Sequence, residues 1–486
     1  MILAIKEQEI PYENPFEFYR HHSSNGDHVS MLMESRSINL AYGKQSIVVP
    51  NAALKITGKN TGFSLEALTE TGEAILSCFD ASDFDYVDNV SFGDGTIEGT
   101  VRREDSRNFE GSELIRQPNA SYVIRTVLEK FPGINDDHLG LYGAFAYDFA
   151  RNFINFGDRF SQEEGQDFSL FLPSTVVYFD DIRGKAKIKR LYFDGKNDNL
   201  EEKTIITSFK SHPLEMFEDM TINQYQEKVT ALIEQIKNGR MMQCVLSRNQ
   251  GMSLQQHPID SYAKLRDINP SPYSFFFSLG DNEYLYGASP EVHINVTDGR
   301  IEIRPIAGTV RRSDNPLEDA DARIGLQIDK KELREHSMLV DLATSELCRL
   351  SVPGSVNIRD LYTLETYPNL YHLVSGVTGE LRKGVDALDS LLTTIPAGTL
   401  SGAPKAEAMK AIEELEHSRR NFYGGAVGYL DFNGGCNTGI TIRSVHVKDG
   451  MSFMRAGAGI VAHSTPEGEA REIGLKSEKA MKVLEK

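Results

Sequence analysis

Four glutamates stand one helical turn apart in two segments that are distant along the chain. Glu332 and Glu335 occur in DKKELREHSMLVDL, and Glu469 and Glu472 occur in TPEGEAREIGLKSEKA, where Lys476 follows. Residues three or four apart share one face of a helix, so each pair presents two carboxylates in one direction. Four oxygen donors from two helices would suit a hard cation such as Mg²⁺, which helps to bind an anionic substrate. The alternative, a solvated helix face, is favoured on pattern alone.

A second candidate is the glycine-rich stretch IPAGTLSGAPKAEAMKAIEELE, residues 395–416. A nucleotide-binding loop fails on spacing, because only three residues separate Gly398 from Gly402 and two more precede Lys405. Pro404 suits a first helical position, and the glycines let backbone N–H groups approach an anion at the start of a helix. A tight turn before a core helix is the better interpretation by spacing alone. The ligand must therefore be identified from the rest of the chain.

Isolated polar residues add weaker signals. Arg443, in TGITIRSVHV, is either an exposed arginine or a clamp for a carboxylate. The small residues after Arg455, in RAGAGIVAH, would let backbone N–H groups crowd an anion. His372, in NLYHLVSGV, lies among apolar residues, where a satisfied core histidine is more common than a proton carrier. Cys436, in NGGCNTG, lacks the setting of a nucleophile, and no glutaminase or hydrolase machinery is visible.

Composition limits the partners. The chain has 486 residues, of which 40% are hydrophobic and 25% charged, as in ordinary globular proteins of two or three domains. A net charge of −18 opposes binding to nucleic acid and to anionic membranes, and it means that a polyanionic substrate needs local cations or a metal. No apolar run has the length of a membrane span, no signal peptide is visible, and the four cysteines have no CxxC spacing. We therefore expect a cytoplasmic protein with reduced thiols.

The elements that must position these residues follow from periodicity. Helices are expected at about 221–238, 329–348, 404–417 and 467–485, the first opened by a capping box at Thr221 to Gln224. Asp-Gly turns at Asp298 and Asp449 join strand-like runs into hairpins. Hairpins interspersed with helices predict an α+β fold with antiparallel sheets. The polar segment 193–220 predicts a boundary between region 1–215 and region 216–486.

Seven motifs together resemble the chorismate-utilising enzymes, most closely the family of anthranilate synthase component I. They are RPIAGT (304–309), EHSMLVDL (335–342), GTLSGAPKAEAM (398–409), YGGAVGY (423–429), IRS (442–444), AGAGIV (456–461) and EAREIGLK (469–476). The resemblance extends into the N-terminal half through LMES and SIVVPNAALKITG. It implies antiparallel sheets packed as a sandwich with outer helices, and a regulatory N-terminal region before a catalytic domain. The anion at the glycine-rich loop would then be a carboxylate of chorismate.

The resemblance also implies roles for individual residues. Glu335 and Glu472 would bind Mg²⁺, with Glu332 and Glu469 supporting it through water. Thr399 and Lys476 would act in catalysis and contact the substrate, which the remaining binding residues would hold: Gly308, Thr309, Tyr423, Arg443, Gly457, Ala458 and Gly459.

Two positions separate the branches of the family. Relatives that add water to chorismate carry a lysine base where this chain has Gln243, and an amide cannot deprotonate water. Relatives that aminate C4 place a nucleophilic lysine where this chain has Ala307. Attack of ammonia at C2 is thus favoured. Glu291 would protonate the departing 4-hydroxyl, and His372 would help to remove the C2 proton as pyruvate leaves, which gives anthranilate.

The resemblance further implies a separate glutamine amidotransferase subunit as the source of ammonia, hence a hetero-oligomer. Ser35, Pro272, Tyr273 and Ser274 match the family's tryptophan feedback pocket, although Ser274 replaces a methionine that is common there. The chain also departs from the family's DLxRND, since it reads DLATSEL through Glu346. Two alternatives remain: an enzyme that releases 2-amino-2-deoxyisochorismate, and a non-catalytic sensor of chorismate or tryptophan. Tryptophan supply and a specialised pathway also stay open.

Overall fold

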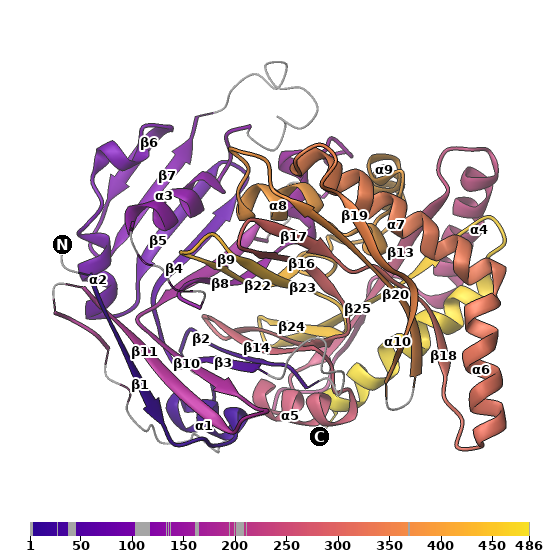
Figure 1. Ribbon diagram of the computed structural model, residues 1–486, viewed down its shortest axis with the longest axis horizontal. Coiled ribbons are helices and arrows are strands. Elements are labelled where there is room, and N and C mark those ends of the chain that lie inside the picture. Colours follow the sequence, from indigo (N-terminus) through magenta and orange to yellow (C-terminus); the bar gives the residue numbers. More distant parts are fainter. Residues whose placement is uncertain are drawn as a thin grey trace.

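Two large antiparallel sheets lie face to face (Figure 1), one of 12 strands and one of 13. The computed structural model describes residues 3–26, 28–36, 45–102, 117–132, 134, 136, 138–160, 165–193, 195–198, 200, 209, 211–367 and 370–485. The expected α+β sandwich with outer helices is confirmed.

The 12-stranded sheet has the order β1 (Leu3–Ile10), β11 (Lys185–Phe193), β10 (Thr175–Asp180), β3 (Gln45–Val49), β2 (Ser30–Glu34), β14 (Tyr273–Gly280), β15 (Glu283–Ser289), β24 (Ser444–Lys448), β25 (Met451–Ile460), β13 (Gln243–Ser253) and β12 (Met216–Glu218), with β21 (Gly402–Ala403) also paired to β13. The 13-stranded sheet has the order β18 (Ile306–Arg311), β20 (Leu370–Glu380), β17 (Arg300–Ile303), β16 (Val292–Thr297), β23 (Cys436–Ile440), β22 (Ala426–Asp431), β8 (Gly140–Phe145), β9 (Phe168–Pro173), β4 (Ala52–Lys59), β5 (Gly62–Ala67), β7 (Thr96–Val101) and β6 (Val87–Phe92), with β19 (Asn357–Thr366) paired to β20.

Alternation along the strands divides the apolar side chains between two cores. In β2, Met31 and Met33 point into the core between the sheets, whereas Leu32 points into the core on the other side of the same sheet. Successive side chains of a strand point to opposite faces, so a fully buried strand such as β2 must be covered on both faces. Helices cover the outer side of the 12-stranded sheet, as the second core requires.

The helices form two groups. Packed on the 12-stranded sheet are α1 (Pro15–His22), α4 (Ile222–Lys237), α5 (Pro258–Ile268), α9 (Lys405–Leu415) and α10 (Pro466–Leu484). Packed on the 13-stranded sheet are α2 (Glu70–Leu76), α3 (Tyr122–Lys130), α6 (Pro316–Ile328), α7 (Lys330–Leu350) and α8 (Ala387–Thr394). Within the described ranges, no helix is both long and apolar enough to cross a membrane.

The structure confirms the predictions that rest on short-range patterns: the four helices, the capping box and the two Asp-Gly turns. The four expected helices are α4, α7, α9 and α10, and the capping box forms, with Thr221 N–H donating to Gln224 Oε1 at 2.8 Å. Both hairpins turn at Asp-Gly pairs with positive φ, 51° and 72° at Asp298 and Gly299. Such turns need positive φ at both central residues, which Asp and Gly tolerate. Pro404 differs slightly, since it is the N-cap of α9 and not its first residue.

In each sheet the strands of region 1–215 form one contiguous half and the strands of region 216–486 form the other, and the halves join where β2 pairs with β14 and where β8 pairs with β22. The two regions therefore share the core between the sheets. The division at residue 215 remains a prediction, and part of the expected boundary segment, including residues 201–208, lies outside the described residues.

Candidate active site

Glu332 and Glu335 lie on α7, Glu469 and Glu472 lie on α10, and the charges of the two helices influence one another. Burial raises the pKa of Glu332 on α7, and the negative charges of Glu335, in the same helix, and of Glu472, on α10, raise it further. Burial likewise raises the pKa of Glu469, and Glu472 adds to the shift, while a hydrogen bond with Ser464 opposes it. Carboxylates affect one another in this way only at short range. The structure thus gathers the four glutamates that the sequence singled out.

This donor set fits a hard divalent cation in chemistry, although it is not a ready-made metal centre. Oε1 of Glu335 is buried and accepts no hydrogen bond, and its nearest cations are His463 Nε2 at 3.5 Å and Lys331 Nζ at 3.8 Å. Glu472 pairs with Lys476 Nζ at 2.7 Å. Among the described residues, no three His, Cys, Asp or Glu side chains form a group that could hold a metal ion. The carboxylates would have to move closer together to do so.

The bulge of β18 connects the acidic helices to the histidine. Gly308 lies in this bulge with φ of 76°, and a Cβ atom there would meet Glu332 Oε2 at 3.2 Å. Thr309 Oγ1 lies 2.7 Å from Nδ1 of His372 on the neighbouring strand β20. Burial lowers the pKa of His372, and the positive charge of Arg443 lowers it further. The imidazole is therefore neutral near pH 7 and can accept a proton.

The charge of Arg443 acts on these groups, because it lowers the pKa of His372 and interacts with Glu472. Its backbone has positive φ, 51°, directly before β24. Burial lowers its pKa, and the fields of Tyr423 and Glu472 oppose that shift. Within the described part of the chain, no ion pair or side-chain hydrogen bond occupies this guanidinium. An arginine left in this state is suited to bind a carboxylate in a two-pronged contact.

Strands β13 and β25 contribute a second group of residues expected to contact the substrate. A Cβ atom at Gly457 would meet the hydroxyl of Tyr423 at 3.0 Å, and one at Gly459 would meet Gln243 Nε2 at 2.6 Å, so a side chain at either position would displace Tyr423 or Gln243. Oε1 of Gln243 is buried without a hydrogen bond. Ala458 differs from its neighbours, because its side chain packs into the core under the helices and only its backbone can face the site.

Lys476 ties β25 to the acidic helix α10. Its Nζ donates to the carbonyl of Gly457 at 2.9 Å and pairs with Glu472. The ammonium thereby stands between the small-residue strand and the gathered carboxylates.

Glu291 supplies a buried acid. It follows β15, it is 8% exposed, and burial raises its pKa from the usual 4.5 to about 7, against the opposing influence of the Thr399 hydroxyl and the Lys476 ammonium. Thr399 lies in a short 3₁₀ turn, Gly398–Leu400. Both residues line a small cavity of about 30 Å³. A carboxyl group that is half protonated near neutral pH can act as a general acid.

The departure at DLATSEL lies against the same cavity. Glu346 is buried and forms an ion pair with Lys405, and burial raises its pKa while Lys405 opposes the shift. The pKa of His293 is lowered to about 3, chiefly by burial and also by the charge of Lys405. Lys405 therefore pairs with Glu346 and does not bind an anion at the glycine-rich loop. In that loop, Gly402 pairs with β13.

The residues of the expected feedback pocket also lie together. Ser274 pairs with Glu34, the neighbour of Ser35, and Arg36 N–H donates to Ser271 O at 3.0 Å, beside Pro272. The Tyr273 hydroxyl crosses to the other sheet and donates to Asn437 Oδ1 at 2.6 Å. Residues 37–44, which continue this segment, lie outside the described residues. Binding of tryptophan there remains a prediction.

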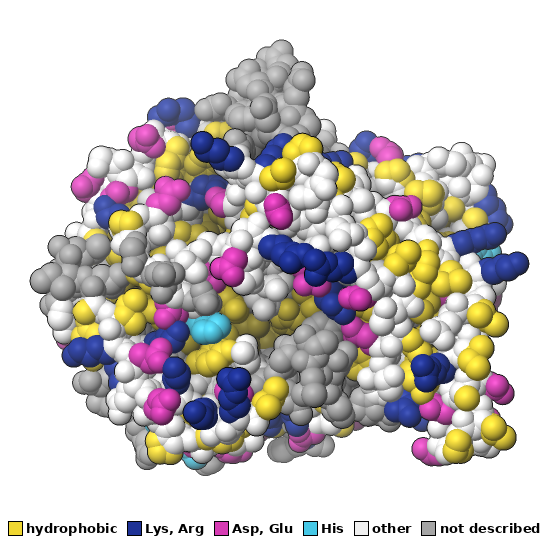
Figure 2. Space-filling view, in the orientation of Figure 1, with side chains coloured by type: hydrophobic (Ala, Val, Ile, Leu, Met, Phe, Trp, Pro, Cys, Tyr) yellow, Lys and Arg dark blue, Asp and Glu magenta, His cyan; other side chains and the backbone are white. Residues whose placement is uncertain are grey.

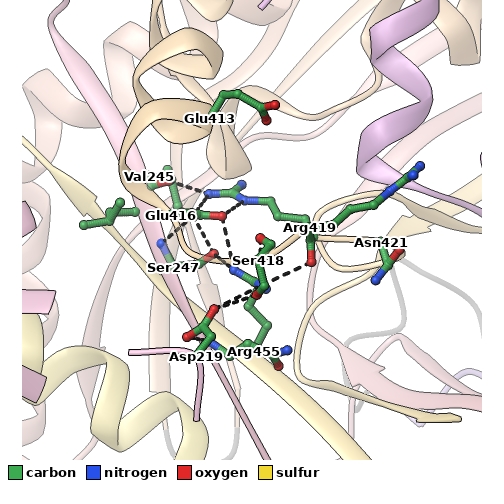
Figure 3. A network of polar contacts seen from close by, with 12 residues as sticks. Asp219, Val245, Ser247, Glu413, Glu416, Ser418, Arg419, Asn421 and Arg455 are labelled. Atoms are coloured by element: carbon green, nitrogen blue, oxygen red, sulfur yellow. Dashed lines mark hydrogen bonds and ion pairs between the residues drawn. The ribbon is translucent and has the colours of Figure 1, made fainter. Parts of the chain in front are cut away.

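A buried charge network behind the site was not anticipated from the sequence. Figure 3 shows Glu416 between Ser247 and Arg455, with Asp219 and Ser418 beyond. Arg420 completes it with two contacts to Glu416. The one local hint in ELEHSRRNFYGG is the spacing of four between Glu416 and Arg420, and it is weak because both residues follow the end of α9.

Comparison with known proteins identifies the family of the chain. The family described as chorismate binding enzyme matches residues 90–482. Anthranilate synthase component 1 of Escherichia coli (strain K12) is 32% identical over 514 residues, which cover 97% of this chain and 95% of that protein. A protein named anthranilate synthase from Azospirillum brasilense is 33% identical over 90% of this chain, and the chain spans only 60% of its length.

Solved structures share the fold. Anthranilate synthase component I from Streptococcus pneumoniae TIGR4 superimposes with a TM-score of 0.69 and 26% identity, over 90% of this chain and 92% of that one. The menaquinone-specific isochorismate synthase of Escherichia coli superimposes with a TM-score of 0.72 over 99% of this chain and 95% of its own. At 18% identity, the second likeness concerns the fold alone.

Proposed function

The chain belongs to the family of chorismate binding enzymes, and from that premise we propose that it is component 1 of an anthranilate synthase. It aminates chorismate at C2 with ammonia and then eliminates pyruvate to give anthranilate. The observation that supports this most is the gathering of carboxylates from α7 and α10 beside Arg443, whose guanidinium is unoccupied within the described structure. Chorismate carries two carboxylates, so its site needs local positive charge in a chain of net charge −18.

A bound Mg²⁺ would account for two observations: Oε1 of Glu335 is buried without a hydrogen bond, and the pKa values of Glu332 and Glu469 are raised. Glu335 and Glu472 would hold it, with Glu332 and Glu469 supporting it through water. When bound, it would neutralise and orient a substrate carboxylate. Arg443 and the ammonium of Lys476 bind the remaining negative charge, and the backbone of Gly457 and Gly459 lets the ring approach.

The first step is amination. Ammonia forms a bond to C2 while the C4–O bond breaks, and Glu291 donates its proton so that the hydroxyl leaves as water. A pKa of about 7 keeps roughly half of the Glu291 carboxyl groups protonated at neutral pH. Gln243 cannot deprotonate water, but its free Oε1 can accept a hydrogen bond from an N–H group. This favours an amine nucleophile over water.

The second step is elimination. His372, neutral because burial and Arg443 lower its pKa, accepts the C2 proton as the enolpyruvyl C–O bond breaks and pyruvate leaves. The Thr309 hydroxyl holds the imidazole of His372 through a hydrogen bond with Nδ1, which leaves Nε2 of the same imidazole to accept the proton. Retention of this pair favours anthranilate over release of 2-amino-2-deoxyisochorismate.

Ammonia comes from a separate glutamine amidotransferase subunit, and tryptophan inhibits through the pocket at Ser35 and Pro272–Ser274. The ring of Tyr273 covers Gly439, and the N–H of the next residue, Ile440, donates to the carbonyl of Glu291 at 3.0 Å. Occupancy of the pocket can thereby be transmitted to the general acid.

Product analysis tests the proposal. Purified protein with chorismate, ammonium and Mg²⁺ should give fluorescent anthranilate together with pyruvate. A non-fluorescent amino product without pyruvate would establish the enzyme that stops after amination. Tight binding without turnover would establish the sensor.

A further inference from the structure

Arg420 contacts three segments that carry residues of the proposed site. Its guanidinium binds Glu416 in a two-pronged contact, with Nε donating to Oε2 at 2.9 Å and Nη2 to Oε1 at 2.5 Å. The remaining donors reach two backbone carbonyls from different segments: Nη1 donates to Leu400 at 2.6 Å, and Nη2 donates to Val245 at 2.7 Å. Both side chains of the ion pair are almost completely buried, at 2% and 1% exposure.

Each of these contacts fixes a wall of the site. Leu400 directly follows Thr399 in the short turn beside Glu291. Val245 lies opposite Gly459 in the β13–β25 register, two residues after Gln243. The guanidinium also lies 5.8 Å from the ring centre of Tyr423, and the backbone N–H of Tyr423 donates to the carbonyl of Arg420 at 3.1 Å.

Glu416 holds the strand from the other side. It accepts hydrogen bonds from the N–H of Ser247 at 2.8 Å and from its hydroxyl at 2.6 Å, and Ser247 lies opposite Gly457 (Figure 3). Arg455 pairs with Glu416 at 3.1 Å and with Asp219 at 3.4 Å, so two arginines balance two carboxylates. Glu416 stays ionised because both arginines hold its pKa low in spite of burial. The network is therefore a fixed scaffold and not a proton donor.

We propose that Arg420, held by Glu416, is a positioning residue that fixes Thr399, Tyr423 and the Gln243–Gly459 wall relative to one another around chorismate. The inference rests on the proposed function. A lysine keeps the charge but cannot reach Glu416 and two separate carbonyls at once, because only the planar guanidinium presents several donors in a fixed fork.

The chain contains a matched control. Arg151 binds Glu413 in the same two-pronged way, at 3.0 and 2.7 Å, with side chains 11% and 7% exposed. It also stacks on an aromatic ring at 4.5 Å, as Arg420 does on Tyr147. Its other contacts are with Asp148 and Gly157, and none is with a residue of the proposed site.

The test compares Arg420→Lys and the double variant Arg420→Met/Glu416→Gln with Arg151→Lys and Arg151→Met/Glu413→Gln. Replacing a buried ion pair by neutral residues of similar size can leave stability almost unchanged, so the single and double variants separate stability from geometry. Melting temperature is measured for each, together with kcat and KM for chorismate with ammonium and Mg²⁺. Displacing reacting groups by about 1 Å costs about 100-fold in rate, so kcat/KM should fall about 100-fold in both Arg420 variants whatever their melting temperatures, and less than about threefold in the Arg151 variants.

The inference is overturned if the Arg420 variants keep kcat/KM within about threefold of the wild type, or if activity follows melting temperature along one curve for both pairs. If neither Arg420 variant folds, Ser247→Ala decides, because it removes one hydroxyl opposite Gly457. KM should then rise severalfold, and the melting temperature should fall as well because a buried hydrogen bond to Glu416 is lost; an unchanged KM would refute the inference. Wild-type protein that makes no anthranilate would instead remove the proposed function first, and the inference with it.

Discussion

Glu291→Gln should make the folded protein more stable at alkaline pH while it removes activity. The folded protein ionises Glu291 near pH 7, whereas the unfolded chain ionises it near 4.5. Below pH 4.5 both states are protonated, so the group has no cost there. Between 4.5 and 7 only the unfolded chain gains free energy by ionising, and the free energy of unfolding therefore falls across this interval and stays low above it.

The size of the effect follows from the shift. A difference of about 2.5 pKa units corresponds to about 3 kcal/mol at full development, at 1.36 kcal/mol per unit. About 0.8 kcal/mol of this is already lost at pH 5, so the advantage of Glu291→Gln over the wild type should grow by about 2 to 3 kcal/mol between pH 5 and pH 8. Any cost of burying the amide is the same at both pH values and cancels.

Urea unfolding at pH 5 and pH 8 measures this difference. Glu227→Gln, on the exposed side of α4, is the control and should show no such gain. In the same preparations, loss of the general acid should lower kcat by about 10² to 10⁴. The reasoning is refuted if the stability difference between Glu291→Gln and the wild type is the same at both pH values, or if it shrinks at pH 8.

Three further predictions concern the rest of the site. Arg443→Lys should raise KM for chorismate by about tenfold or more, since a point charge replaces a two-pronged contact, and steady-state kinetics that show an unchanged KM would contradict this. Glu472→Gln should weaken Mg²⁺ binding in calorimetry of the protein without substrate, whereas the exposed Glu478→Gln should not, and equal affinity in both would count against a metal at α7 and α10. Tyr273→Ala should reduce inhibition by tryptophan while kcat without tryptophan stays within about threefold, and inhibition that is fully retained would disprove coupling through Gly439.

The sequence predicted best what depends on short-range chemistry. Helical spacing placed Glu332 beside Glu335 and Glu469 beside Glu472, and positive-φ turn residues placed the hairpins. That charges on α7 and α10 influence one another follows from no local pattern, because the two helices are far apart along the chain. The resemblance of seven motifs to one family supplied that juxtaposition.

The residues that escaped prediction are those whose partners are distant or hidden. Glu346 is an ordinary helix residue until the fold brings Lys405, 59 positions later, against it beside a small cavity. Glu416 and Arg420 are four apart, but they follow the end of α9, so the spacing suggested no pair. Gly457 and Gly459 lie on the face of β25 toward the site, whereas the side chain of Ala458 lies on the face toward the core. A run of small residues in a strand does not reveal which of the two faces meets Tyr423.

The central claim is tested most directly by incubating the protein with chorismate, ¹⁵N-ammonium and Mg²⁺ and following both products by mass. The account predicts anthranilate carrying one ¹⁵N atom and pyruvate in equal amounts, with no isochorismate. Labelled 2-amino-2-deoxyisochorismate that accumulates without pyruvate, unlabelled isochorismate, or chorismate recovered unchanged would each contradict it.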